Sequence, residues 1–279
     1  MNPLKPIYWH QGLFLQPHHF QQSERHGASQ HGPSMLYSVP WFWGVQKCVL
    51  DDQALAAGRI VCSEAEFVFA DGTWISLPGN AVALARTIDT ARIEPHKPIT
   101  VLIGLRRYCP NQSNVAHDQA PEVLAQAGLR YVVDPGADGV PDLHDTGESG
   151  QVLRLNHLLK IFLDTDREEL GEYAVLPIAR IEYTGEGFVR YPDFAPPSVT
   201  LAASPVLLRL SRAIADQLLA TSRQLEQYKV PRESVKSLTG AAYVSYMLGL
   251  MMVNRYVPLL YHHLLSPVCH PFEFFGVLR

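Results

Sequence analysis

Hydrophobic and polar residues alternate in short runs through the first two thirds of the chain. Two of these runs, 59–70 and 73–77, flank Asp71-Gly72, a dipeptide typical of hairpin turns. Further strand candidates cover 39–50, 82–84, 99–108, 129–133, 173–183 and 188–191, while 152–163 fits either a strand or a helix. Residues 134–150 are predicted to be an exposed loop. Many short strands separated by turn residues predict a mainly β N-terminal domain, an antiparallel sandwich or barrel, over residues 1–200.

The pattern changes to a helical period near residue 204. Ser204-Pro205 joins an N-cap residue to a proline at the first helical position. One apolar stripe follows at helical spacing, formed by Leu207, Leu210, Ile214, Leu218 and Leu225. After a break at Pro231, a second stripe comprises Val235, Leu238, Ala242, Tyr246, Gly249, Val253, Tyr256 and Leu260. We therefore predict that residues 201–279 form a helical bundle of two long helices and the start of a third. The third helix begins at His270-Pro271 and has barely two turns before the sequence ends.

The second predicted helix is apolar on nearly every side, with Met247, Leu248, Leu250, Met251 and Met252 around its circumference. A helix of this kind has to be covered all round. A two-helix hairpin cannot supply that cover, so we predict self-association through the helical part. A monomeric bundle completed by residues beyond this chain remains the alternative.

Residues 8–26 are rich in aromatic side chains and hold four of the twelve histidines. We expect a strand-like run over 8–15, a short helix over 18–25 that begins after Pro17, and a Gly/Ser/Pro-rich link over 27–38. Trp9, Phe14 and Phe20 are large apolar groups that should pack against the rest of the molecule. We therefore predict that this stretch braces the β domain, with these three residues as core anchors.

Composition narrows the class of protein. The chain has 47% hydrophobic and 18% charged residues, which is typical of a folded protein. A net charge of −4 argues against binding to nucleic acid, which requires a basic face. The apolar window 241–253 is too short to cross a bilayer, and four scattered cysteines indicate reduced thiols. These features predict a cytoplasmic protein without membrane insertion.

Two kinds of chemistry can be weighed against a structural role. His10, His18, His19, His26 and His31 suggest a metal-dependent hydrolase, although their spacing matches no strong metal motif. Exposed tryptophans can stack on sugar rings, so Trp41, Trp43 and Trp74 suggest a carbohydrate-binding β module. No catalytic, cofactor or metal-binding motif is assembled, and a structural or adaptor role is therefore favoured.

The N-terminal stretch resembles a known family signature. Its pattern W-H-x-G-x-F-L-x-P-x-H-F-Q-Q is carried by Trp9, His10, Gly12, Phe14, Leu15, Pro17, His19, Phe20, Gln21 and Gln22. The segments at 173–181 (YAVLPIARI), 194–197 (FAPP), 202–207 (AASPVL) and 270–275 (HPFEFF) follow in the family's order. On these residues the chain resembles the TssK (ImpJ or VasE) family of type VI secretion baseplate subunits.

The resemblance implies a fold, a set of partners and no enzymatic activity. Family members are homotrimers whose β shell domain is likened to the shoulder of phage receptor-binding proteins. That shell docks on the baseplate wedge of TssF and TssG, and a C-terminal head domain contacts the membrane complex TssJ–TssL–TssM. This sequence lacks the head, so the resemblance implies wedge binding by residues 1–200. Trimerisation is expected through a neck that includes Leu207, Leu210, Ile214, Leu218, Leu225, Tyr246, Val253 and Leu260.

Overall fold

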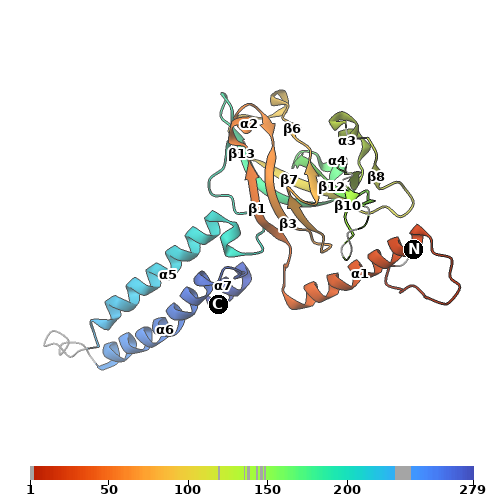
Figure 1. Ribbon diagram of the computed structural model, residues 1–279. Coiled ribbons are helices and arrows are strands. Elements are labelled where there is room, and N and C mark those ends of the chain that lie inside the picture. Colours follow the sequence, from red (N-terminus) through yellow and green to blue (C-terminus); the bar gives the residue numbers. More distant parts are fainter. Residues whose placement is uncertain are drawn as a thin grey trace. The chain divides into compact units, whose positions relative to one another are not determined.

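A computed structural model describes residues 3–229 and 240–279, apart from 119, 135, 137, 138, 143, 145, 146 and 148. The chain divides into two compact units, Met1–Pro197 and Ser198–Arg279. The described strands all lie in the first unit, and the second unit is helical (Figure 1). The predicted fold class, a β-rich region followed by helices, is confirmed.

The larger sheet of the first unit has seven strands in the order β14-β13-β7-β12-β9-β8, with β5 also paired to β12. Their bounds are β5 Ala81–Ala83, β7 Ile99–Arg106, β8 Val115–Ala116, β9 Tyr131–Val133, β12 Leu155–Leu163, β13 Tyr173–Tyr183 and β14 Phe188–Arg190. Neighbouring strands from β14 to β9 are antiparallel, whereas β5–β12 and β8–β9 are parallel pairs. The stretch that fitted either a strand or a helix is thus strand β12, and the sheet is mixed rather than purely antiparallel.

The smaller sheet contains β1 (Gly44–Leu50), β3 (Cys62–Val68) and β4 (Trp74–Leu77). The predicted hairpin is confirmed, because β3 and β4 pair antiparallel and the carboxylate of Asp71 accepts a hydrogen bond from the Thr73 amide at 3.0 Å. Phe67 of this sheet belongs to the same buried core as Ile103 and Leu176 of the larger one. Each such side chain contributes about 1.5–3 kcal/mol by leaving water, so this shared core holds the two sheets together.

Short elements connect and flank the sheets. They are β2 (Arg59–Ile60) paired with β6 (Arg86–Thr87), helix α2 (Asp52–Ala56), the 3-10 turn η1 (Thr90–Arg92) and helix α3 (Pro121–Ala127). A further hairpin, β10 (Gly139–Val140) with β11 (Gly150–Gln151), lies in the predicted loop 134–150, part of which is outside the described residues.

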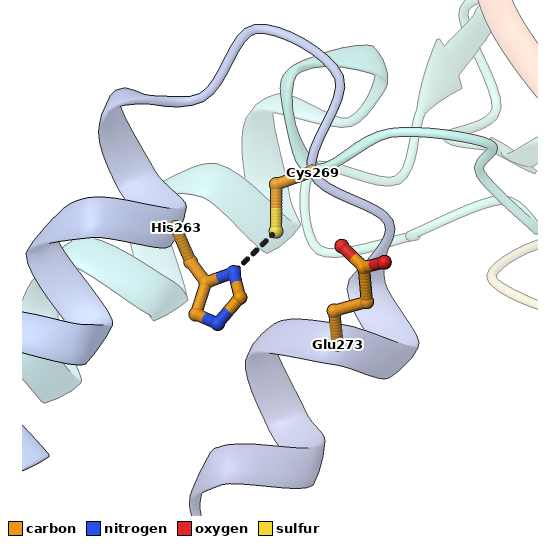
Figure 2. A group of neighbouring side chains, drawn as sticks. All are labelled: His263, Cys269 and Glu273. Carbon is orange, nitrogen blue, oxygen red and sulfur yellow. Dashed lines mark hydrogen bonds between the residues drawn. The ribbon is translucent and has the colours of Figure 1, made fainter.

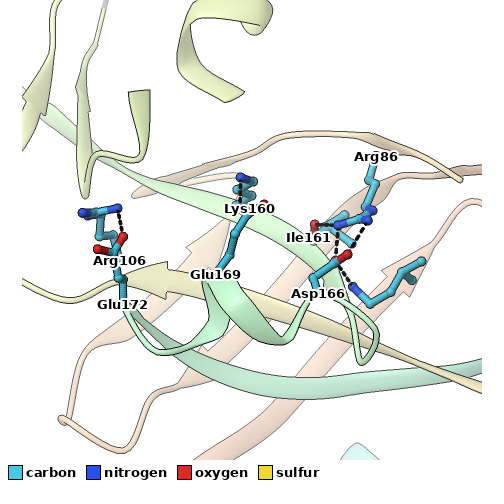
Figure 3. Close-up of polar contacts among 8 residues, drawn as sticks. Arg86, Arg106, Lys160, Ile161, Asp166, Glu169 and Glu172 are labelled. Carbon is cyan, nitrogen blue, oxygen red and sulfur yellow. Dashed lines mark hydrogen bonds and ion pairs between the residues drawn. The ribbon is translucent and has the colours of Figure 1, made fainter. Parts of the chain in front are cut away.

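A four-residue helix, α4 (Arg167–Leu170), lies between β12 and β13 and is fixed by ion pairs (Figure 3). Asp166, which precedes it, binds Arg86 of β6 through two contacts of 2.5 and 3.0 Å. Glu169 binds Lys160 of β12 at 2.6 Å. Glu172, after the helix, binds Arg106 of β7 at 2.7 Å. Opposite charges therefore tie this connection to three different strands.

Helix α1 spans Pro17–Ser38, and the predictions for this region are only partly right. The helix does begin at Pro17, but it continues through the stretch predicted as a link, including Pro33 in its interior. Residues 8–15 form no strand, and the chain turns there at Gly12, whose φ is +85°. The Gly/Ser/Pro-rich composition of 27–38 indicated a link, but contacts with residues far along the chain support a helix here. In one of them, the Arg25 guanidinium lies 4.0 Å from the centre of the Tyr108 ring.

The second unit is a helical hairpin followed by a short helix. Its elements are the 3-10 turn η2 (Leu201–Ala203), α5 (Pro205–Glu226), α6 (Gly240–Leu265) and α7 (Pro271–Val277). The predicted N-cap is confirmed, because the Ser204 hydroxyl accepts a hydrogen bond from the Leu207 amide at 3.3 Å. Pro231, Val235 and Leu238 lie outside the described residues.

Contacts between the two long helices pair polar as well as apolar side chains. Ser222 of α5 donates a hydrogen bond to the Asn254 side chain of α6 at 2.6 Å. Just beyond the end of α5, Tyr228 stacks on Tyr246 of α6 with the ring centres 4.4 Å apart. Within the described residues, none of the helices is long and apolar enough to cross a membrane.

Candidate interaction surface

The aromatic side chains of the N-terminal signature lie in solvent. Trp9 is 50% exposed, Phe14 80% and Phe20 55%. The prediction that these three residues anchor the core is therefore wrong for the single chain. The physical reason is that the side chains of the two sheets already fill that core, with Phe67 and Ile103 fully buried, and no strand pairing draws the N-terminal segment into it.

Backbone and ring contacts nevertheless give the signature segment a defined shape. The Leu13 amide donates to the His10 carbonyl across the turn at Gly12, and Pro17 is the first residue of α1. The Gln16 amide donates to Nδ1 of His19 at 3.2 Å, which satisfies an amide just before the helix. Nδ1 of His10 likewise contacts the backbone and lies 3.1 Å from the Gln11 carbonyl oxygen.

The exposed apolar residues continue along α1, which has no buried residue over its 22 positions. We call the following set the N-terminal apolar surface: Tyr8, Trp9, Phe14, Leu15, Phe20, Met35, Leu36, Tyr37 and Trp41. Soluble proteins rarely leave so many large apolar groups in water unless a partner covers them. A surface rich in Trp, Tyr and Phe also matches the residue types that dominate binding energy at protein interfaces.

The tryptophans proposed for sugar stacking divide into two groups. Trp43 is partly buried and packs on the core of the first unit, so less of its ring is open to a ligand. Trp41 and Trp74 are 59% and 52% exposed, and the indole N–H of Trp74 donates to Glu66 at 3.2 Å. Partial burial therefore weakens the hypothesis for Trp43, whereas Trp41 and Trp74 keep more than half of their surface exposed.

The N-terminal histidines do not gather into a metal-ligand group. Among the described residues, the one group of three or more potential ligands is His263, Cys269 and Glu273, in the second unit. Burial, followed by the nearby negative charge of Glu273, raises the pKa of the Cys269 thiol. Sequence reasoning missed this group. The available signal was the spacing H-x5-C-x3-E across the prolines that separate the last two helices.

The residues predicted for a trimeric neck have several environments. Leu207, Leu218 and Leu260 belong to the core of their own unit, and Leu260 is fully buried. The prediction that Leu260 contacts another copy is therefore wrong, because the helices of its own unit already bury this side chain. Leu210 is 49% exposed, while Ile214, Leu225, Tyr246 and Val253 are partly buried, and their role stays a prediction. The exposed large apolar residues of α6 are instead Val244, Leu248, Met251, Met252, Leu259 and Leu265.

A buried polar cluster in the first unit is structural. The Arg130 guanidinium is almost fully buried and donates to the Arg106 carbonyl at 2.8 Å and to the Thr73 hydroxyl at 2.9 Å. It also lies 3.4 Å from the Asp71 carboxylate. Burial, and then the positive charge of Arg130, lower the pKa of His157 to about 4. This histidine is therefore uncharged at neutral pH.

Comparisons with known proteins define the class of this fold. A crystal structure of TssK matches with a TM-score of 0.85 at 21% identity, over 99% of this chain and 59% of that one. TssK in a TssK-TssF-TssG baseplate subcomplex of the type VI secretion system, solved by cryo-electron microscopy, matches with a TM-score of 0.80 at 22% identity, over 98% and 85% of the two chains. The fold of the two units is thus that of TssK proteins.

Sequence comparison then gives the family. The family described as bacterial type VI secretion, VC_A0110, EvfL, ImpJ, VasE matches residues 19–279, and the chain belongs to this family. The type VI secretion system baseplate component TssK1 of Pseudomonas aeruginosa is 28% identical over 275 residues, which make up 98% of this chain. The chain spans 59% of the length of that relative.

Proposed function

We propose that this protein is a structural subunit of a type VI secretion baseplate that docks on a wedge of TssF and TssG. Membership of the family and the similar fold of TssK in a TssK-TssF-TssG baseplate subcomplex support this role. The single observation that carries the docking proposal is the N-terminal apolar surface. Four of its residues, Trp9, Phe14, Leu15 and Phe20, belong to the family signature, and each is at least half exposed.

The docking contact uses aromatic side chains as anchors. Trp9 and Phe14 flank the turn at Gly12, which one backbone hydrogen bond, from the Leu13 amide to the His10 carbonyl, closes in the single chain. A preformed segment loses less conformational entropy on binding than a disordered one. Burying these two rings against the wedge then supplies the favourable free energy that the folded single chain does not gain from them.

The second part of the proposal is a homotrimer. Leu248, Met251 and Met252 lie on α6 with more than half of each side chain exposed. Burying this face between copies removes it from water, and we assign the neck contact to it together with Leu210. The domain division at about residue 200 would then separate a wedge-binding part from an oligomerisation part.

Contact with a membrane complex (TssJ–TssL–TssM) belongs, in this proposal, to the portion of the longer relatives that this chain does not span. We place the protein in the cytoplasm, where the baseplate wedge assembles, and assign it no catalytic role, no cofactor and no nucleic-acid partner. The function proposed for residues 1–279 is thus wedge binding and self-association.

Paired substitutions in the N-terminal apolar surface test the docking contact. Trp9→Ala with Phe14→Ala should weaken co-elution with a TssF–TssG complex by at least about tenfold, because hot-spot residues each contribute more than about 1.4 kcal/mol. Tyr191→Ala is the matched control, since it removes an aromatic side chain that is 41% exposed elsewhere in the same unit. Unchanged wedge binding by the double variant would refute this assignment of the surface.

A further inference from the structure

Three side chains from successive pieces of the second unit meet where α6 ends and α7 begins (Figure 2). His263 lies in the last turn of α6, Cys269 in the connection and Glu273 in the first turn of α7. The imidazole nitrogen, the thiol sulfur and a carboxylate oxygen all lie within 4.8 Å of one another. Nothing in the proposed baseplate role requires this meeting of three different metal-ligand types.

The backbone fixes the place of Cys269 between the two helices. Its carbonyl accepts a hydrogen bond from the Leu201 amide at 2.9 Å, and its side chain is 2% exposed. Nδ1 of His270 accepts from the Phe272 amide at 3.1 Å and caps α7, which sets the first turn that carries Glu273. The fold therefore positions Cys269 and Glu273 independently of any contact between these two side chains.

The separation of sulfur and nitrogen fits two ligands of one tetrahedral ion. Zinc binds thiolate sulfur at about 2.3 Å and imidazole nitrogen at about 2.0–2.1 Å, so tetrahedral geometry places these two atoms about 3.6 Å apart. Sγ of Cys269 and Nδ1 of His263 are 3.6 Å apart. The same two atoms form a weak hydrogen bond between the thiol and the imidazole, so they already face each other.

The chemistry of the set selects a class of cation. A thiolate with an imidazole favours zinc and similar transition metals, whereas calcium and magnesium take oxygen ligands. Glu273 is exposed, His263 is partly buried and Cys269 is buried, so one side of the group is open for an ion to enter. Three protein ligands leave a fourth position, which water can fill.

We propose that His263, Cys269 and Glu273 bind one zinc-class divalent transition cation per chain and thereby join the end of α6 to α7. On binding, the sulfur–metal bond replaces the thiol S–H bond, and the proton passes to solvent. The cation is then a structural link between the two helices. This site is independent of the N-terminal apolar surface, so either proposal can fail without the other.

Metal analysis and cobalt substitution test the site on the whole purified chain. After treatment with a chelator and addition of zinc, the desalted protein should retain one zinc per chain. Cobalt(II) in place of zinc should give a thiolate-to-metal charge-transfer band in the near ultraviolet, which reports a cobalt–sulfur bond directly. Glu273→Gln changes an exposed side chain, and Cys269→Ser replaces sulfur by oxygen with little change in shape.

The two variants should weaken binding by at least about tenfold, the lower end of the loss known for outer-shell partners of metal ligands. Cys269→Ser should also abolish the charge-transfer band. His262→Gln and Cys109→Ser are matched controls that alter a histidine and a cysteine outside the group, and both should keep the band. A wild-type protein that retains no zinc, a cobalt spectrum without the thiolate band, or equal binding by Glu273→Gln would each overturn the proposal.

Discussion

His157 lies on β12, close to the buried guanidinium of Arg130, and this position makes the first unit sensitive to acid. Folding lowers the pKa of this histidine from its ordinary value of 6.5 to about 4, through burial first and the Arg130 charge second. Between these two pH values the unfolded chain binds a proton that the folded chain does not. Stability is therefore lost as the pH falls from about 6.5, and the loss is complete near pH 4.

The size of the effect follows from the two pKa values. One pKa unit corresponds to about 1.4 kcal/mol, so a shift from 6.5 to about 4 gives a loss of about 3 kcal/mol when complete. Between about pH 7 and pH 5 the same linkage gives a loss of about 2 kcal/mol. The pKa of the Asp71 carboxyl is lowered from 3.8, so its stabilising effect is lost only at more acidic pH, as that group becomes protonated.

Tryptophan fluorescence during urea unfolding measures this loss. All four tryptophans lie in the first unit, so the signal reports on the unit that contains His157. Between about pH 7 and pH 5, the free energy of unfolding of the His157→Gln variant should fall by about 2 kcal/mol less than that of the wild type. His117→Gln removes an exposed histidine and should behave as wild type. The same pH slope in wild type and His157→Gln, or an NMR titration of His157 near 6.5, would refute the reasoning.

Three further predictions concern contacts that stabilise each unit by itself. Gly104→Ala would place a β-carbon 2.7 Å from the ring of buried Phe162, and urea unfolding should show a loss of about 1–3 kcal/mol; unchanged stability would contradict that close approach. Asp166→Asn should remove about 1–2 kcal/mol by weakening the pair with Arg86, less than for a fully buried pair because both side chains are partly exposed. In the Asp166→Asn variant, a second change, Arg86→Met, should cause little further loss of stability. If the losses from the two single changes add in full, Arg86 and Asp166 do not stabilise the fold as a pair. Ser204→Ala should destabilise α5 by about 1 kcal/mol in thermal unfolding followed by circular dichroism, and Ser204→Asn should restore the cap.

The elements that could be predicted from sequence are those whose causes are local. Asp71 and Gly72 supply a turn that any chain of that pattern adopts, and β3 and β4 follow from it. Ser204 and Pro205 start α5 through a hydrogen bond that spans three residues. Where a strand or helix depends on its immediate neighbours in the chain, a pattern of a few residues is sufficient.

The N-terminal region and the metal-ligand group depend on distant contacts. Helix α1 runs through Pro33 although its own composition indicates a link, and Arg25 contacts the Tyr108 ring far along the chain. The wrong prediction that Trp9 is a core residue was based on its hydrophobicity alone. A single sequence does not distinguish an apolar side chain buried within its own chain from one that contacts a partner. His263, Cys269 and Glu273 come together only through the turn between α6 and α7, so their proximity is evident only from the three-dimensional structure.

The most direct test of the baseplate role is the solution mass of this chain by light scattering, alone and then mixed with a TssF–TssG complex. We expect a mass of three chains for the protein alone and a single co-eluting species that contains it with TssF and TssG. A chain that elutes apart from the wedge complex at every mixing ratio would contradict the central claim.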